Sequence, residues 1–167
     1  MADLTQKVVR EIFNYKNGRL FWKKIQTPNQ VKVGDRAGWL ENHGYRRVLI
    51  YGKCYLEHHI IFLWHHGYLP NKVDHINRRK NNHIDNLREA TQSQNMMNTT
   101  KRKNTTSQYK GVYYNKGRAR WVASITLNGK LKHLGYFLTE AEAALFYNKA
   151  AAEMFGDYAH LNNIGGD

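Results

Sequence analysis

The deciding stretch of this sequence is VDHINRRKNNHIDNLR, residues 73–88, around which the rest of the chain is organised. Its apolar start is expected to be a short extended segment, and the polar, basic residues that follow are expected to form a loop. Thr91 is a suitable N-cap for a helix over residues 92–97. The chain is therefore predicted to run here as a strand, a loop and a helix.

Three side chains in and after this stretch suit the hydrolysis of a phosphodiester. His75 has a reference pKa of about 6.5, so it can accept a proton at neutral pH. Asp74 offers an anionic oxygen, and Asn95 a neutral one, to a hard divalent cation such as magnesium or manganese. A site with so few protein ligands keeps coordination positions for phosphate and water. Asn82 or Asn86 could pin the loop to the backbone and so fix the His75 ring.

The charge of the chain favours a polyanionic partner. Among 167 residues, 26 Lys and Arg face 13 Asp and Glu, which gives a formal net charge of +13. No acidic residue lies between Glu89 and Glu140, although many basic residues do. Because cationic side chains near phosphates release counterions, this local excess predicts nucleic-acid binding.

Upstream of the deciding stretch, apolar periodicity predicts a short helix over residues 4–13, followed by two hairpins. The first hairpin turns at the Asn-Gly dipeptide of residues 17–18, which supplies the positive φ of a type I′ turn. The second hairpin spans residues 45–56 and turns at residues 51–53. Residues 26–38 are expected to be a loop.

Four histidines, His58, His59, His65 and His66, lie in an apolar segment over residues 57–66 that is predicted to be a helix. The two pairs are two helical turns apart, which is too far for the i, i+4 spacing of a zinc-chelating pair. We expect His58 to pack or hydrogen-bond near the active centre and the other three to lie on the surface.

Residues 99–107 contain no apolar residue and are predicted to be a basic linker. Beyond it, residues 109–114, 120–127 and 130–137 are predicted to be strands, and Thr139 to cap a helix. Residues 108–163 are thus expected to form a three-stranded antiparallel sheet packed on one helix. The helix would cover one face of the sheet, leaving the other with cations and aromatic side chains.

Residues 57–98 closely resemble the HNH endonucleases of phages and mobile introns. The likeness is carried by His58, by VDHIN at residues 73–77 and by NNHIDNLREATQSQN at residues 81–95. It implies an α+β protein whose N-terminal part, residues 1–98, is an HNH nuclease domain of the ββα-metal fold. Two further histidines, His58 and His83, are expected to support the active site.

The resemblance also implies roles for the residues of the motif. His75 would be the general base and Asn86 the structural asparagine of the loop. Asp74 and Asn95 would bind one magnesium or manganese ion per active site. In the loop and the linker, the residues expected to contact DNA are Arg78, Arg79, Lys101, Arg102 and Lys103.

The C-terminal part, residues 108–163, resembles the ethylene-response-factor (Apetala-type) DNA-binding domain. The likeness is carried by YKGV at residues 109–112, RWVA at 120–123 and LGYF at 134–137. That family lays its three-stranded sheet into the major groove. Carried over to this sequence, the DNA-contacting residues would be Lys110, Arg118, Arg120, Trp121, Lys130 and Lys132.

Together the two resemblances predict a monomeric, site-directed endonuclease of the homing type that hydrolyses double-stranded DNA. Two alternatives are a non-catalytic DNA-binding regulator with a relic nuclease domain and an RNA-processing nuclease. A single cysteine, Cys54, excludes an intrachain disulfide and a multi-cysteine zinc site. Since no secretory signal or apolar run of about 18 residues is present, we expect a soluble intracellular protein without a membrane partner, in the host cytoplasm if phage-encoded.

Overall fold

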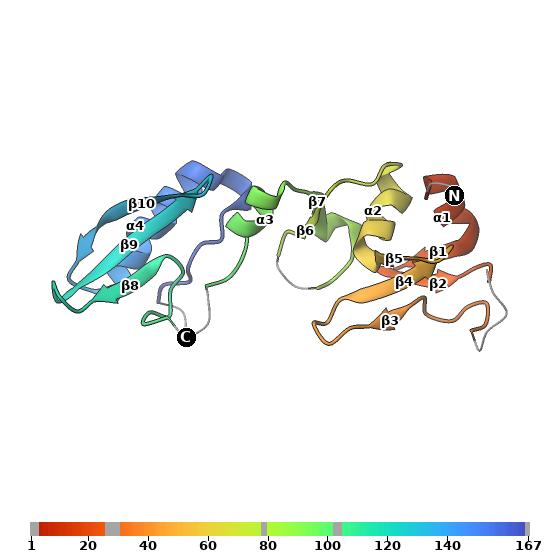
Figure 1. The fold of residues 1–167 in the computed structure, drawn as a ribbon, viewed down its shortest axis with the longest axis horizontal. Helices are drawn as coiled ribbons and strands as arrows, with labels where there is room; N and C mark the ends of the chain where they lie inside the picture. The colour runs from red at the N-terminus through yellow and green to blue at the C-terminus, as the bar shows by residue number, and fades with distance from the viewer. Residues whose placement is uncertain (1–3, 26–30, 78–79, 102–104, 166–167) are drawn as a thin grey trace. The chain divides into compact units, whose positions relative to one another are not determined.

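The computed structural model describes residues 4–25, 31–77, 80–101 and 105–165 (Figure 1). The chain divides into two compact units, Met1–Thr91 and Gln92–Asp167. Within the described residues, no helix has both the length and the apolar character needed to cross a membrane.

The described part of the first unit combines three helical segments with seven short strands. Its helical segments are α1 (Gln6–Ile12), α2 (Glu57–His66) and the 3-10 turn η1 (Ile84–Asn86). Its strands are β1 (Phe13–Lys16), β2 (Arg19–Trp22), β3 (Trp39–Leu40), β4 (Arg46–Ile50), β5 (Lys53–Leu56), β6 (Val73–His75) and β7 (Leu87–Glu89). They form three antiparallel sheets, in the orders β1-β2, β3-β4-β5 and β6-β7.

The first predicted hairpin is confirmed. Asn17 and Gly18 have φ values of 47° and 73°, the two positive angles that a type I′ turn needs. Gly18 is also constrained by packing, because a Cβ atom there would lie 2.8 Å from the backbone nitrogen of His83. The turn of this hairpin therefore packs against the loop that follows β6.

Helix α2 has the predicted bounds and lies in the core of the first unit. Ile60, Ile61 and Leu63 are fully buried among residues of α1, the first hairpin and the second sheet. Gly67 ends the helix with φ of 84°, and its backbone N–H donates to the carbonyl of Leu63.

The deciding stretch contains one strand more than the sequence predicted. After the loop, η1 leads into β7, which pairs antiparallel with β6 so that Asp74 lies opposite Arg88 and His75 opposite Leu87. The segment Leu87–Glu89 has one apolar residue, so its alternation is too weak to be read as a strand from sequence. Its partner β6 supplies the hydrogen bonds that make it one.

The second unit matches its prediction closely. It contains α3 (Gln92–Met97), β8 (Val112–Asn115), β9 (Arg120–Leu127), β10 (Lys130–Phe137), α4 (Glu140–Phe155) and the 3-10 turn η2 (Gly156–Tyr158). The sheet is antiparallel in the order β10-β9-β8, and α4 packs against it through a core containing Ala143, Ala144 and Tyr147. The capping box of Thr139 and Glu142 is present, with both reciprocal hydrogen bonds.

Strand β8 begins three residues later than predicted because Gly111 has φ of 75°, which is outside the extended region. A Cβ atom at this position would come within 2.1 Å of the Tyr147 ring, so only glycine allows α4 to approach the sheet here.

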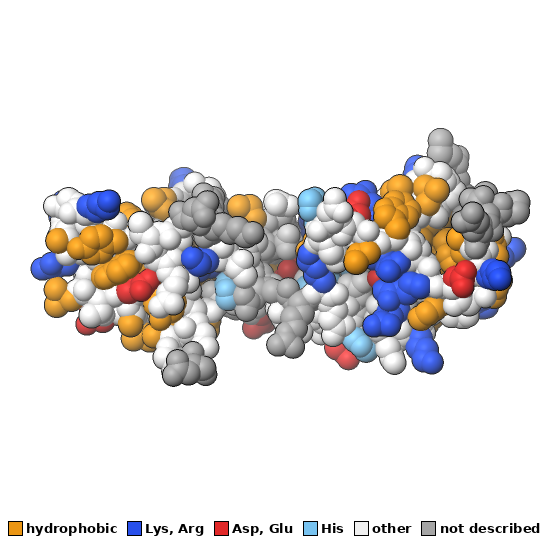
Figure 2. All heavy atoms as spheres, turned by 90° about the horizontal axis from the view of Figure 1, so that it is seen from below, with side chains coloured by type: hydrophobic (Ala, Val, Ile, Leu, Met, Phe, Trp, Pro, Cys, Tyr) orange, Lys and Arg blue, Asp and Glu red, His pale blue; other side chains and the backbone are white. Residues whose placement is uncertain are grey.

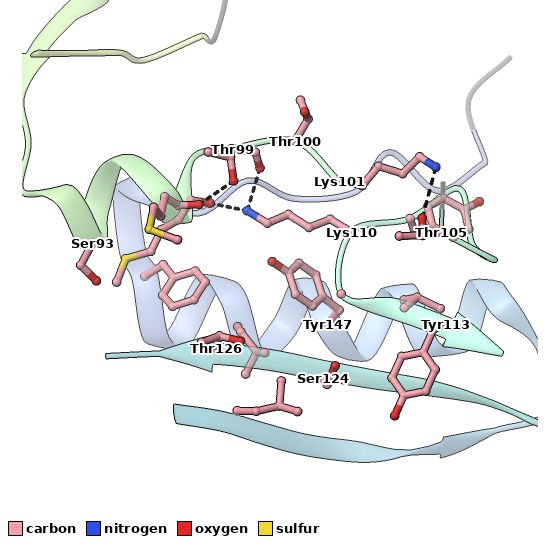
Figure 3. A pocket seen from close by; sticks show the side chains of 18 of the residues that line it. Ser93, Thr99, Thr100, Lys101, Thr105, Lys110, Tyr113, Ser124, Thr126 and Tyr147 are labelled. Carbon is pink, nitrogen blue, oxygen red and sulfur yellow. Dashed lines mark hydrogen bonds between the residues drawn. The ribbon is translucent and has the colours of Figure 1, made fainter. Parts of the chain in front are cut away.

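The segment predicted to be a basic linker is partly structured. Ser107 is 2% exposed, and its hydroxyl donates to Glu140 at 2.6 Å. The Nζ of Lys110 donates to the backbone carbonyls of Met97 (2.6 Å) and Thr99 (2.7 Å), above a pocket of about 700 Å³ into which the Tyr147 ring projects (Figure 3). The predicted linker therefore packs against its own unit at both ends.

Candidate active site

His75 ends β6 and is only 6% exposed. Its Nε2 lies 2.8 Å from the Oδ1 of Asn82, in the loop after the strand. The pKa of His75 is lowered by burial, while the hydrogen bond with Asn82 and the neighbouring Asp74 carboxylate partly offset this effect. A ring with a lowered pKa is neutral at physiological pH, which is the form that a general base requires.

A buried carboxylate lies behind Asn82. Glu57, the first residue of α2, is 1% exposed, and its carboxylate accepts a hydrogen bond from Asn82 Nδ2 at 3.0 Å. It also accepts from the backbone N–H of Leu20 (3.1 Å) and from the Arg36 guanidinium (3.0 Å). A buried charge is costly unless it is paired and hydrogen-bonded, and these donors satisfy both conditions.

Asp74 is buried beside His75 and is held by an ion pair. Its Oδ2 accepts from Nε (3.0 Å) and Nη2 (2.8 Å) of Arg88, its cross-strand neighbour on β7. Asp74 and His75 are both only 6% exposed.

Asn86 braces the loop from inside. It is 6% exposed; its Oδ1 accepts from the backbone N–H of Asn77 at 2.9 Å, and its Nδ2 donates to the carbonyl of Asn81 at 2.7 Å. These two bonds tie both ends of the loop to one side chain. The loop-pinning role considered for Asn86 and Asn82 is thus divided, because Asn86 bonds the backbone whereas Asn82 bonds the His75 ring.

The rings of His58, His75 and Tyr45 gather around the site. The His58 ring lies 4.9 Å from the His75 ring and 5.5 Å from the Tyr45 ring. Burial, with His75 and His59 nearby, lowers the pKa of His58 to about 3. His58 is therefore neutral at physiological pH and packs against the His75 ring. The surface position expected for the other three histidines of α2 is wrong for His59 and His65, which are half-buried.

A cation-lined cleft of about 510 Å³ opens beside Glu57 and Asn82. Its lining includes the turn of the first hairpin and five basic side chains, namely Arg19, Arg36, Arg46, Lys80 and His83. On the face drawn in Figure 2, Lys and Arg side chains gather more densely over the first unit than over the second. Of these five residues, only His83 was assigned a role in the site from the sequence.

Lys101 is the described one of the basic linker residues predicted to contact DNA, and it is hydrogen-bonded within the second unit, as is Lys110 at the start of the C-terminal part. The Nζ of Lys101 donates to the carbonyl of Ser107 at 3.0 Å, and Lys110 bonds the two carbonyls described above. Arg102 and Lys103, like Arg78 and Arg79 in the first unit, lie outside the described residues.

The predicted DNA-contacting residues of the sheet are divided between its two faces. Trp121 packs with the core between sheet and helix, on the same side as Ile125. Lys132 lies directly opposite Ile125 across the β9–β10 pair, and Lys130 opposite Leu127, so both lysines also emerge on that side. The Arg118 guanidinium instead stacks 4.8 Å over the Tyr136 ring, and Arg120 is exposed on the open face.

The second predicted metal ligand, Asn95, lies on α3 in the second unit. Its role beside Asp74 therefore stays a prediction. Among the described residues, no group of three or more His, Cys, Asp and Glu could hold a metal ion. A carboxylate with an amide oxygen still fits magnesium or manganese, since such ions commonly keep several water and phosphate ligands.

Glu57 and Arg36 were missed by the sequence reasoning. Residues 57–66 look like an apolar helix, and a single acid in the first turn of a helix is common because it complements the helix dipole. The available signal was its place directly before His58, which had already been assigned to the active centre.

Comparison with known proteins assigns one stretch of the chain to a family. Residues 55–97 match the family model of the HNH endonucleases. This match covers α2, the β6–β7 pair and α3, and it therefore includes Glu57, His58, His75, Asn82 and Asn86. The chain carries an HNH endonuclease domain, which supports a nuclease function.

A relative comes from Acanthamoeba polyphaga mimivirus and is described as an uncharacterized HNH endonuclease. The two sequences are 37% identical over 129 residues, which is 75% of this chain and 66% of the relative. The chain thus spans just under two thirds of the length of this protein. No solved structure matches the chain.

Proposed function

We propose that this protein is a site-directed DNA endonuclease of the homing type, acting as a monomer. The observation that carries the proposal is the buried His75, hydrogen-bonded by Asn82 and adjacent to Asp74, inside an HNH endonuclease domain. In this proposal residues 1–98 cut, residues 99–107 connect, and residues 108–163 choose the site.

In this proposal the side chains of the protein abstract a proton from water and bind the metal ion. His75 takes the proton from the water that attacks the phosphorus atom, because its ring is neutral at physiological pH. Asn86 keeps the loop closed so that the ring holds its position. Asp74 and Asn95 would hold one magnesium or manganese ion, which supplies Lewis-acid polarisation of the phosphate when bound.

The nuclease unit also offers an electrostatic route to its substrate. The cleft beside Asn82 is lined by Arg19, Arg46 and Lys80, and phosphate groups are the natural partners of such a surface. Lys80 lies over the Tyr45 ring at 4.4 Å, which holds one of these cations near the histidine cluster. The formal charge of +13 supports the same class of substrate.

The decisive experiment is His75→Ala. We expect cleavage of duplex DNA in magnesium to fall by about two to four orders of magnitude while DNA binding is retained. His43→Ala, at an exposed position of the same unit, is the matched control. Cleavage at the wild-type rate by the His75 variant would overturn the assignment.

The same assay separates the alternatives. A regulator with a relic nuclease domain would bind DNA without magnesium-dependent nicking, and an RNA-processing enzyme would be inhibited more strongly by structured RNA than by duplex DNA. Strand-specific mapping of the cuts, with magnesium and manganese compared, would show whether one strand or both are hydrolysed.

We also propose that the second unit reads the DNA site, as its resemblance to the Apetala-type domain implies. Arg120→Ala should relax sequence preference, because arginine is the usual reader of guanine, whereas Lys101→Ala should weaken binding to all sequences alike. Equal, sequence-independent losses from both variants would count against a reading role for the sheet. The measurement is affinity for randomised duplexes at fixed salt.

A further inference from the structure

The buried carboxylate of Glu57 dictates how the neighbouring amide must be oriented. An ionised carboxylate only accepts hydrogen bonds, and this one already accepts from Leu20 N–H and Arg36. The atom of Asn82 that lies 3.0 Å from it must therefore be the amide nitrogen. This leaves the amide oxygen, Oδ1, facing His75.

The amide oxygen in turn determines which nitrogen of the His75 imidazole carries the proton. An amide oxygen only accepts, so the His75 Nε2 atom 2.8 Å from it must carry the hydrogen. We propose that Glu57 and Asn82 are positioning residues that lock His75 in the Nε2–H tautomer, so that Nδ1 is the atom that accepts the proton from water. This inference rests on the proposed function, because it names the reacting atom of the proposed base.

The surrounding packing makes Asn82 a rigid part of this chain of bonds. The turn at Gly18 lies against Asn82 and His83 so closely that a Cβ atom would meet the Asn82 carbonyl carbon at 2.9 Å. Asn86 holds the preceding residue, Asn81, by its carbonyl. Because these contacts fix the backbone around Asn82, the motion left to its amide group is rotation about the side-chain bonds. The hydrogen bond to Glu57 restrains this rotation.

Exchanging the acid and the amide between positions 57 and 82 tests the idea without changing the net charge. In Glu57→Gln alone, the oxygen of the introduced amide stays with Leu20 N–H, so its NH₂ group faces Asn82 and turns that amide over. His75 Nε2 then meets a donor, and the proton moves to Nδ1. In Asn82→Asp alone, two carboxylates face each other across the distance now bridged by a hydrogen bond, about 3 Å.

The double variant Glu57→Gln/Asn82→Asp restores the sequence of donors and acceptors. The introduced amide at position 57 donates to one oxygen of the introduced carboxylate at position 82, and the other oxygen accepts from His75 Nε2–H. We expect each single variant to lower the rate of DNA cleavage about 10- to 100-fold, the usual effect of losing an orienting partner, and the double variant to recover to within about fivefold of wild type. Glu11→Gln, an acid-to-amide change at an exposed position of α1, should leave the rate unchanged.

Nitrogen NMR of histidine-labelled protein reads the tautomer directly, without metal or DNA. At about pH 8, the His75 signals, assigned by their loss in His75→Ala, should show a protonated Nε2 in wild type and in the double variant. In Glu57→Gln the proton should shift toward Nδ1. A protonated Nδ1 in wild type, or an unchanged tautomer in Glu57→Gln, would overturn the proposal.

The two readouts keep this inference separate from the proposed function. If the wild-type protein cut no DNA, the endonuclease assignment would fail, yet the NMR experiment would still decide whether Glu57 and Asn82 lock the ring. If wild type cut DNA and the double variant was no faster than the single variants, the positioning role would fail while the endonuclease assignment stood.

Discussion

Burial of neutral His58 should make the stability of the first unit depend on pH. The folded-state pKa of His58 is about 3, lowered by desolvation and by the neighbouring His75 and His59, against about 6.5 in an unfolded chain. Between these values the unfolded state binds a proton that the folded state does not. The folded state is therefore fully stable above about pH 6.5 and loses stability as the pH falls toward 3.

The loss of unfolding free energy follows from the pH interval over which the unfolded state alone binds the proton. From about pH 6.5 to pH 5 is roughly 1.5 units, and each unit corresponds to about 1.4 kcal/mol, so His58 alone should lower the free energy of unfolding by about 2 kcal/mol. His58 is 4% exposed, so solvent screening does little to reduce this value. His58→Phe removes the titrating group while keeping a ring in the buried position.

The assay is urea unfolding at about pH 7.5 and pH 5, in the presence of a chelator. A Trp121→Phe background leaves Trp22, Trp39 and Trp64 as fluorophores, and all three belong to the first unit. Between the two pH values, His58→Phe should lose about 2 kcal/mol less than wild type, and a control, His43→Gln at an exposed position, should follow wild type. Equal losses in wild type and His58→Phe would refute the reasoning.

Two further predictions concern stability. Arg88→Met should destabilise the first unit by about 3 kcal/mol, because it removes the ion pair of the buried Asp74 carboxylate. Adding Asp74→Asn should recover much of this loss, and urea unfolding measures both variants. A loss under about 1 kcal/mol in Arg88→Met would contradict the argument. Gly111→Ala should destabilise the second unit by at least about 2 kcal/mol, since it places a Cβ against Tyr147 as well as straining the backbone. Gly129→Ala, with a similar φ of 76° but open space around it, is the matched control and should cost about 1 kcal/mol in thermal unfolding followed by Trp121 fluorescence.

The second unit was predictable because its signals are local. The turn at residues 128–129, the alternation along β9 and the capping box at Thr139 each specify their own geometry within a few residues. The start of β8 was placed wrongly because the conformation of Gly111 is set by a distant contact with Tyr147, which adjacent residues do not reveal.

The candidate site was predictable only in part, for a related reason. His75, Asp74 and Asn86 lie within one recognisable stretch, and the structure buries all three together. The carboxylate of Glu57 reaches the site from α2, and Arg36 reaches it from a loop before β3. A hydrogen bond between residues this far apart in sequence leaves no periodic pattern. Neither strand β7 nor the hydrogen bond from Asn82 to Glu57 could therefore be predicted without the structure.

The donors to Glu57 have a consequence for where this endonuclease motif can function. Leu20 and Arg36 precede the stretch that matches the HNH family model, residues 55–97, yet they hold the acid that orients Asn82. A fragment limited to that stretch would keep every residue assigned to the chemistry and still lack the scaffold for its base. Under the proposed function, nuclease activity would then depend on the docking of the N-terminal hairpin and not on the matched stretch alone.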